Sequence, residues 1–356
     1  MKIGHIIPGI IFTFLLAMLA VVLSSWLGTT VLQYVVSPVS AVLLAIVIGI
    51  ILRTFCSLPA YLDSGIDFTS KYILRFGIIL LGIRLSLFEF VQFGLLAIPL
   101  ILVCFFGVFV AIRFCLYFFP ISKNMSYLIG IGTAICGVTA IVATSPLIKA
   151  KQEEVAYAIA IITLFGMFAM LAYPFTAHAL FPESNLAIGL FLGTSLHDTT
   201  QVTGAALIYS EQFNNSEVVN ITVVTKLIRN SFLVILIPMI AMMYKNNNNQ
   251  SSTISYSFNH IFPYFVLGFL GMVMLRTIGD ASITDSSVMK LSQWQWLIAN
   301  VKIISEISLT MAMVAMGLLT YVSKLKILGG KPLVVGLVTA MTVGFASLLY
   351  IYCLIR

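Results

Sequence analysis

The sequence predicts an all-α, polytopic membrane protein, because it is far more apolar than a soluble domain and its apolar residues form long runs. Of its 356 residues, 60% are hydrophobic and 9% are charged, and the mean hydropathy is +1.09. A soluble domain carries about 25% charged residues. A helix needs roughly 20 residues to cross a bilayer, and about eleven apolar segments reach that length. We therefore expect one integral membrane domain over residues 1–356.

The expected spans are joined by short connections, which leave no room for a separate soluble domain. They cover residues 6–27, 37–55, 69–88, 93–119, 125–147, 153–180, 187–209, 218–244, 258–279, 295–321 and 331–355. The first span is too long for the apolar core of a signal peptide, so we expect it to be retained. The residues from Lys245 to Ser257 are polar and of low complexity, and we expect them to form a loop.

The charged residues and the cysteines exclude several classes of function. The net charge of +7 comes from Lys and Arg that lie mostly between apolar segments. This pattern sets membrane orientation and argues against a nucleic-acid partner. With the N-terminus in the cytoplasm, ten of these residues fall inside and six outside, a weak preference for N-inside and C-outside. The five cysteines are scattered, so we expect no metal site, cofactor or disulfide framework.

The seventh span carries polar residues at its centre, within GLFLGTSLHDTTQVTG (189–204). On a continuous helix, the spacing i, i+3, i+4, i+7 would place four of them on one stripe: Thr194, His197, Asp198 and Gln201. A carboxylate at this depth costs roughly 3 kcal/mol, so Asp198 needs a partner. We expect His197 and Asp198 to couple a proton to transport, or His197 to be a neutral, hydrogen-bonded side chain.

The eighth span places Lys226 and Arg229 on one helix face together with Thr222. Two cations against the single carboxylate of Asp198 leave a surplus near +1, which a small anion would balance. The planar guanidinium of Arg229 can donate two parallel hydrogen bonds to an oxyanion. The structural alternative is a buried ion pair of Asp198 with one of these cations, holding two helices together.

The fifth span contains GTAICGVTA (132–140), which resembles GTSLHDTTQ (193–201) in the seventh. Both place glycine and small polar residues in mid-span, a pattern typical of discontinuous helices beside a binding site. We expect helix breaks at Gly132, Gly137 and Gly193. The alternative is close helix packing through small residues. Together with Arg229 and Lys226, the expected substrate-binding residues are Thr194, Gln201, Thr133, Cys136, Gly137 and Thr139.

A second internal similarity relates residues 80–102 to residues 315–337. These stretches lie around the third and tenth spans, whose orientations are opposite. Such a relation predicts an inverted-topology repeat.

Several blocks of the sequence resemble the bacterial UPF0324 membrane proteins, also called the YeiH-like sulfate exporter family. They are GIGTAICGVTAIVATSPLIKAKQEEVAYAIAIITLFG, FLGTSLHDTTQV, VTKLIR, LRFGIILLGIRLS and GGKPLVVGL, and the resemblance covers nearly the whole chain. The chain departs from the family pattern at Asp198, where glutamate is usual, and at Thr139, where serine is common. The resemblance implies a multi-pass protein of the inner membrane. Its fold would contain inverted repeats with discontinuous helices, similar to the cation–proton antiporter and bile-acid-symporter group.

The expected function is secondary active export of a small anion such as sulfate by alternating access, coupled to protons or sodium. Arg229 and Lys226 would bind the anion, and Asp198 and His197 would serve coupling. An anion channel would use the same positive stripe. A membrane-embedded enzyme is disfavoured, because no second catalytic histidine, no GxSxG motif and no metal-ligand spacing occurs. The expected partners are the anion and membrane lipid, with a homodimer left open.

Overall fold

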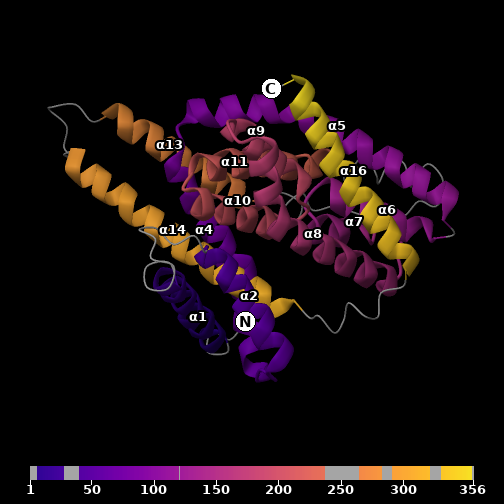
Figure 1. Cartoon of the computed structure of the whole chain (residues 1–356), viewed down its shortest axis with the longest axis horizontal. Coiled ribbons are helices and arrows are strands. Elements are labelled where there is room, and N and C mark those ends of the chain that lie inside the picture. Colours follow the sequence, from indigo (N-terminus) through magenta and orange to yellow (C-terminus); the bar gives the residue numbers. More distant parts are fainter. Residues whose placement is uncertain are drawn as a thin grey trace. The chain divides into compact units, whose positions relative to one another are not determined.

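The computed structural model describes residues 6–27, 40–119, 121–236, 264–282, 291–320 and 330–354. Within these residues every regular element is a helix (Figure 1). Seven of the described helices are long and apolar enough to cross a membrane: α1 (Ile7–Trp26), α5 (Leu87–Phe118), α8 (Gln152–Leu180), α11 (Glu217–Ser231, with a further turn to Leu236), α13 (Phe265–Ser282), α14 (Leu291–Leu319) and α16 (Gly330–Leu354). The all-α, multi-pass membrane fold is therefore confirmed.

The number of eleven spans stays a prediction. The predicted loop Lys245–Ser257 and parts of several predicted spans lie outside the described residues. The similarity between residues 80–102 and 315–337 also runs into residues 321–329, which are outside them. Two predicted spans, 125–147 and 187–209, are broken in mid-span, and their interruptions form the candidate site described below; the predicted span 69–88 is interrupted near its end, at residues 85–86.

Contacts divide the chain into two compact units, each assembled from separate segments. The first contains residues 1–92, 203–220 and 264–324, and the second contains residues 93–202, 221–263 and 325–356. The sequence, interpreted as a single domain, does not predict this division. Three of the five unit boundaries fall inside α5, α10 (Thr199–Phe213) and α11, which carry the chain from one unit to the other.

The first unit contains α1, α2 (Ala41–Phe55), α13, α14 and a bent segment made of η3 (Ala60–Leu62), α3 (Asp63–Phe68), η4 (Thr69–Ile73), α4 (Leu74–Leu81) and η5 (Gly82–Arg84). Its helices approach closely through small residues, as is common between membrane helices. A Cβ atom on Gly49 would lie 2.6 Å from the Val314 carbonyl oxygen. The Glu211 carboxylate accepts hydrogen bonds from the Ser40 hydroxyl (2.7 Å) and the Val42 N–H (3.2 Å), which fixes the end of α10 to the start of α2.

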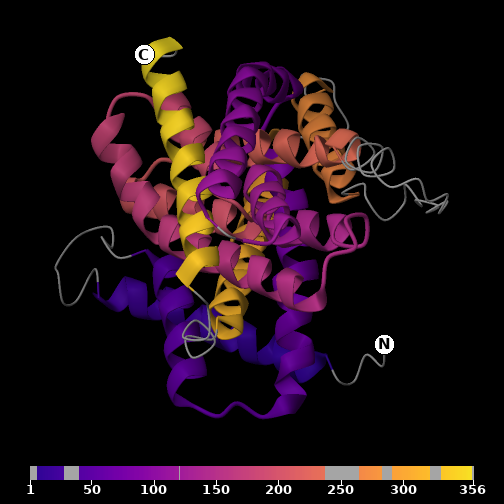
Figure 2. The same ribbon diagram turned by 90° about the vertical axis from the view of Figure 1, so that its right-hand side faces the viewer.

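The second unit is built on long helices whose directions position the candidate site. Figure 1 and Figure 2 show both helices: α16 crosses α5, and a Cβ atom on Gly107 would lie 3.3 Å from the Thr342 methyl group. Gly336 of α16 lies against Phe165 of α8, and Gly344 lies against Tyr173 about two turns further on. Because both residue numbers increase together, α16 and α8 run in the same direction.

Candidate functional site

The fifth predicted span is interrupted in its middle. Helix α6 (Lys123–Ala134) ends before residues 135–137, and α7 (Val138–Thr144) begins after them. Gly137 has a φ of +67°, in the left-handed region that favours glycine. A Cβ atom at this position would also lie 3.2 Å from the Cβ atom of Asp198. The break predicted at Gly137 is therefore present, and it lies directly against the polar centre of the seventh predicted span.

The seventh predicted span is interrupted in the same way. Helix α9 (Asn185–Ser195) ends before residues 196–198, and α10 begins at Thr199. The last residues of α6 and α9 are 61 positions apart, and so are the first residues of α7 and α10. The similarity between 132–140 and 193–201 thus has a structural counterpart. The expected stripe on one helix was wrong, because Thr194 lies on α9 and Gln201 lies on α10.

The breaks predicted at Gly132 and Gly193 were also wrong, because both glycines lie inside helices, in the last turns of α6 and α9. They are packing positions. Gly132 has no room for a Cβ atom beside Ile162, and a Cβ atom on Gly193 would lie 2.6 Å from the Cβ atom of Thr225. Small residues at these positions let neighbouring helices come close, and the chain breaks three residues later.

We expect Gly193→Ala to destabilise the protein by about 1–3 kcal/mol, because the added methyl group overpacks the contact with α11. The matched control is Gly271→Ala in α13, where a Cβ atom has nothing within 4 Å. That change should be neutral or stabilise by about 0.5–1 kcal/mol, because alanine favours the helix. The midpoint of thermal unfolding in detergent measures both. Equal midpoints for the two variants would contradict the assignment of Gly193 to packing.

The first broken segment folds back on itself. The Ser122 hydroxyl, just before α6, donates to the Glu154 carboxylate at the start of α8, and Gly132 near the end of α6 lies against Ile162. Helices α6 and α8 therefore run side by side in the same direction. Gly132 also lies against Ile141 of α7, with its Cβ position 2.9 Å from that side chain. Because these residues flank the break, α7 returns along α6, and the two form a hairpin.

The second broken segment folds back as well. A Cβ atom on Gly189 would lie 2.5 Å from the Cβ atom of Ile221, and Gly193 meets Thr225 one turn later, so α9 and α11 run in the same direction. A three-residue turn, 214–216, joins α10 to α11, and the Asn230 amide at the end of α11 donates to the Thr199 hydroxyl at the start of α10 (3.1 Å). Helix α10 is therefore antiparallel to α11 and to α9.

The two hairpins approach each other from opposite ends of α8. Helix α6 begins beside the start of α8, whereas α9 follows the end of α8 after residues 181–184. Their tips, residues 133–138 and 194–199, meet where Gly137 lies against Asp198. The sequence did not predict hairpins, because an apolar segment of about 20 residues has the same composition whether it crosses or returns.

Lys226 joins the two tips from α11. Its Nζ atom donates to the carbonyl oxygen of Ile135 in the first tip (3.0 Å) and to those of Leu196 (3.2 Å) and His197 (2.5 Å) in the second. The side chain is 1% exposed. One ammonium group therefore uses all three of its N–H donors on backbone carbonyls.

Arg229 bridges the same tips one turn further along α11. Its Nε atom donates to the Ala134 carbonyl (2.5 Å), its Nη2 atom to Thr133, and its Nη1 atom to Thr194 (2.6 Å) and Leu196 (2.9 Å). The residue is fully buried. These carbonyls lie at the C-terminal ends of α6 and α9 or just beyond, where a helix leaves its last carbonyls unpaired and carries partial negative charge. The two cations thus cap both helix ends.

This arrangement differs from both roles that the sequence suggested for the cations. Arg229 has five N–H donors and Lys226 has three, and seven of these eight are bound to carbonyls. In this conformation the Arg229 guanidinium therefore has no pair of free N–H groups with which to bind an oxyanion. In the part of the chain that the structure describes, no carboxylate lies within 4.0 Å of either cation, so an ion pair with Asp198 is not formed.

Asp198 and Gln201 cap the start of α10 reciprocally. The Asp198 carboxylate accepts the Thr200 N–H (3.0 Å), and the Gln201 side-chain carbonyl accepts the Asp198 N–H (3.2 Å). This resembles a capping box, except that the Asp198 carboxylate accepts the N–H of the second helical residue and not the third, and the sequence signature, an acceptor followed three residues later by Gln, was present in DTTQ. The Gln201 amide also donates to the Thr163 carbonyl of α8 (3.3 Å). Both residues therefore fix the second hairpin.

Several buried polar atoms around the second tip have no hydrogen-bond partner among the described residues: Ser195 Oγ, His197 Nδ1, Thr222 Oγ1 and Thr225 Oγ1. All four side chains are at most 1% exposed. Native proteins pair nearly all buried polar groups, so a local concentration of unpaired ones indicates a place where a ligand can bind. Sequence reasoning missed Ser195 and Thr225, which look like ordinary small helix residues.

The remaining predicted site residues either contact α16 or lie in the first hairpin. The Thr194 hydroxyl lies 2.8 Å from that of Ser347, and the Thr133 hydroxyl lies 3.5 Å from that of Thr339. Helix α16, which the sequence did not connect to the site, therefore contacts both hairpins. Cys136 is buried at the first tip, whereas Thr139 is exposed on α7.

The balance of charge at the tips is positive. Each break contributes one helix C-terminus and one helix N-terminus, whose partial charges of about −0.5 and +0.5 cancel. Lys226 and Arg229 together with Asp198 then leave a formal surplus near +1, as the sequence indicated.

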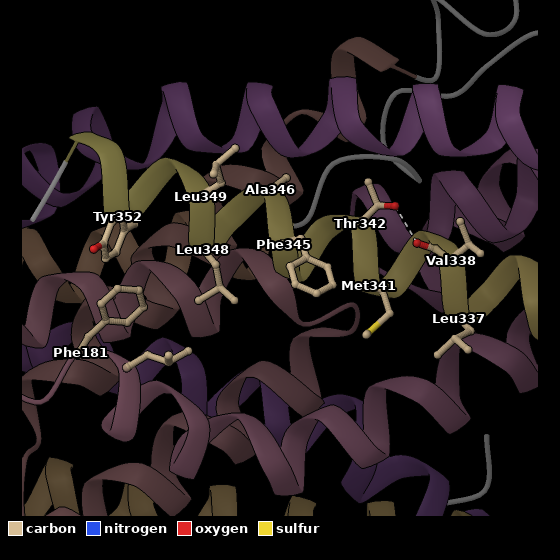
Figure 3. Close-up of a pocket in the computed structure, with 11 residues that line it drawn as sticks. Phe181, Leu337, Val338, Met341, Thr342, Phe345, Ala346, Leu348, Leu349 and Tyr352 are labelled. Carbon is tan, nitrogen blue, oxygen red and sulfur yellow. Dashed lines mark hydrogen bonds between the residues drawn. The ribbon is translucent and has the colours of Figure 1, made fainter.

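A surface groove of about 860 Å³ lies along α16 and the end of α8, from Leu337 to Tyr352 and beside Phe181 (Figure 3). Its lining is almost wholly apolar, and the Thr342 hydroxyl is already bound to the Val338 carbonyl (2.7 Å). Such a surface suits hydrocarbon chains, so the polar hairpin tips are the better candidate for an anion. No group of three or more His, Cys, Asp or Glu side chains that could hold a metal ion occurs among the described residues.

Comparison with known proteins agrees with the family resemblance. Residues 8–336 match the family model described as conserved hypothetical protein 698. A UPF0324 membrane protein of Streptococcus agalactiae is 34% identical over 331 residues, covering 93% of this chain and 92% of that protein. UPF0324 membrane proteins of Staphylococcus aureus and Fusobacterium nucleatum are 32% and 31% identical, with coverage of at least 97% of each chain.

These three names state a membrane protein and no substrate. No solved structure matches the chain. The family match and the relatives each span more than nine-tenths of the sequence, from the first helix to the last. The chain therefore belongs to the UPF0324 family of membrane proteins.

Proposed function

We propose that this protein is a secondary active transporter of a small anion such as sulfate, working by alternating access. The observation that carries the proposal is a pair of buried cations, Lys226 and Arg229, at the meeting point of two hairpin tips. No carboxylate lies within 4.0 Å of them in the described part of the chain. Charged side chains inside a membrane are costly, pair with one another or with backbone carbonyls, and are typical of ion and substrate pathways.

The two cations would attract the anion chiefly through their positive electrostatic potential. They also hold in place the two tips that form the site. Direct contacts would come from the remaining N–H of the Arg229 guanidinium and from unpaired neutral groups such as Ser195 Oγ and His197 Nδ1. Asp198 and His197 would provide coupling, because a carboxylate and an imidazole at the second tip can exchange protons during transport.

Sulfate flux into proteoliposomes of the purified protein tests the proposal. We expect saturable flux that depends on a pH or sodium gradient, and other small oxyanions should compete with it. Ser195→Ala should raise the half-saturating concentration about tenfold, the equivalent of about 1.4 kcal/mol. The control is Ser145→Ala, whose hydroxyl donates only to the Val142 carbonyl of its own turn (3.1 Å).

Two results would count against this function. Absence of gradient-dependent flux for sulfate and for a panel of small inorganic and organic anions would remove the proposal. Flux that rises linearly without saturation, at rates far above transporter turnover, would instead indicate an anion channel.

A further inference from the structure

The two ends of the second unit differ in charge. At one end α5 finishes and α6, α8 and α16 begin, because α6 and α16 both run parallel to α8. This end carries five basic residues in the described part of the chain: Arg113, Lys123, Lys149, Lys151 and Lys331. At the other end lie residues 181–184, which join α8 to α9. This short stretch contains Glu183 and no Lys or Arg.

Basic residues near membrane helices concentrate on the cytoplasmic side, so this asymmetry orients the unit. We infer that residues 123–150 and 185–216 are re-entrant hairpins that enter the membrane from opposite faces, the first from the cytoplasm and the second from outside. The first hairpin returns to the cytoplasmic face, so α8 is the helix that crosses next. The second returns to the outer face, and α11 then crosses back.

This topology resolves the weak orientation signal of the sequence. An uninterrupted crossing by residues 125–147 places Lys149 and Lys151 outside. A returning hairpin places both lysines in the cytoplasm, and the second hairpin leaves the sidedness of all later connections unchanged. The sequence-based count changes from ten against six to twelve against four, in favour of a cytoplasmic N-terminus. Two independent observations, side-chain contacts and charge, thus agree.

The re-entrant topology assigns a separate role to each tip. Cys136 and His197 occupy equivalent places, 61 residues apart, in the two breaks. Withdrawal of the first hairpin would open the site to the cytoplasm past Cys136, and withdrawal of the second would open it to the outside past His197. This assignment of two gates rests on the proposed transport function, whereas the topology itself does not.

Thiol labelling tests the topology without any anion. The parent protein carries Cys56→Ser and Cys353→Ser, which remove the two exposed thiols, and its residual labelling gives the background. Single cysteines then replace four exposed residues: Lys123, Gln152, Glu183 and Ser216. A membrane-impermeant maleimide is applied to intact cells and to inverted membrane vesicles, and the labelled protein is quantified in each.

We expect Lys123→Cys and Gln152→Cys to be labelled in inverted vesicles only, and Glu183→Cys and Ser216→Cys in intact cells only. Labelling of Lys123→Cys and Gln152→Cys from opposite faces would show that residues 125–147 cross the membrane and would overturn the first hairpin. Labelling of Glu183→Cys and Ser216→Cys from opposite faces would overturn the second hairpin. Correct pairing with reversed sides would overturn the orientation. A protein that passes this test but transports no anion would refute the function and keep the topology.

Discussion

Replacement of Arg229 by methionine is expected to destabilise the protein by more than about 3 kcal/mol, because each buried carbonyl group that loses its partner costs about 1–3 kcal/mol. The side chain makes four hydrogen bonds to carbonyls at the ends of α6 and α9. Methionine fills a similar volume but leaves those carbonyls unpaired in a buried site, which is costly. Expression level and the thermal unfolding midpoint in detergent measure the effect.

Arg113→Met is the matched control, because Arg113 lies exposed on α5. It should change the midpoint little, since exposed substitutions away from special features are within about 0.5 kcal/mol. Arg229→Lys provides a variant that can still fold, with three donors in place of five. A midpoint for Arg229→Lys above that of Arg229→Met supports capping of the helix ends. Normal stability of Arg229→Met would refute it.

Asp198→Asn is expected to leave stability nearly unchanged and to abolish the dependence of anion flux on a pH gradient. Asparagine caps a helix about as well as aspartate, so the fold should change by no more than about 0.5 kcal/mol. Asp198 is the single carboxylate in the two described tips, residues 133–138 and 194–199, so proton exchange through a carboxyl group there requires it. The measurement is sulfate flux into proteoliposomes with and without an imposed pH gradient.

The comparison variant is Asp198→Ala, which loses the cap on the Thr200 N–H and should cost about 1 kcal/mol. If both variants keep their response to the pH gradient, Asp198 serves only as a cap, and the coupling proposal fails for this residue. If asparagine alone destabilises the protein, the capping geometry at the start of α10 is wrong.

The sequence predicted the fold class, because composition decides it, and it singled out polar residues in apolar segments that the structure brings together. Asp198, Lys226 and Arg229 were identified from the cost of burying charge; Asp198 lies in the second tip, and the two cations bind both tips from α11. Their partners were not predictable in the same way. The cations bind backbone carbonyls, and every residue carries a carbonyl, so no sequence pattern marks those acceptors.

The hairpins also lay beyond sequence reasoning, although two signals pointed toward them. The repeated Gly-Thr at 132 and 193 indicated equivalent segments, and DTTQ carried the signature of a helix start inside an apolar run. Neither signal indicates whether the chain crosses the membrane at this point or returns to the face from which it entered. That depends on contacts with α8 and α11, which are remote in sequence from each tip. The unpaired hydroxyl of Ser195 likewise becomes visible only when its surroundings are known.

The seven hydrogen bonds that Lys226 and Arg229 donate are divided between the two hairpins. Three serve the tip that ends α6 and four serve the tip that ends α9, and the number of N–H groups is fixed. When one tip withdraws, the N–H groups that were bound to its carbonyls become free. A bound anion can then accept hydrogen bonds from these N–H groups. Anion binding would then favour the conformation in which one hairpin has withdrawn, because the anion accepts the N–H donors that this hairpin releases.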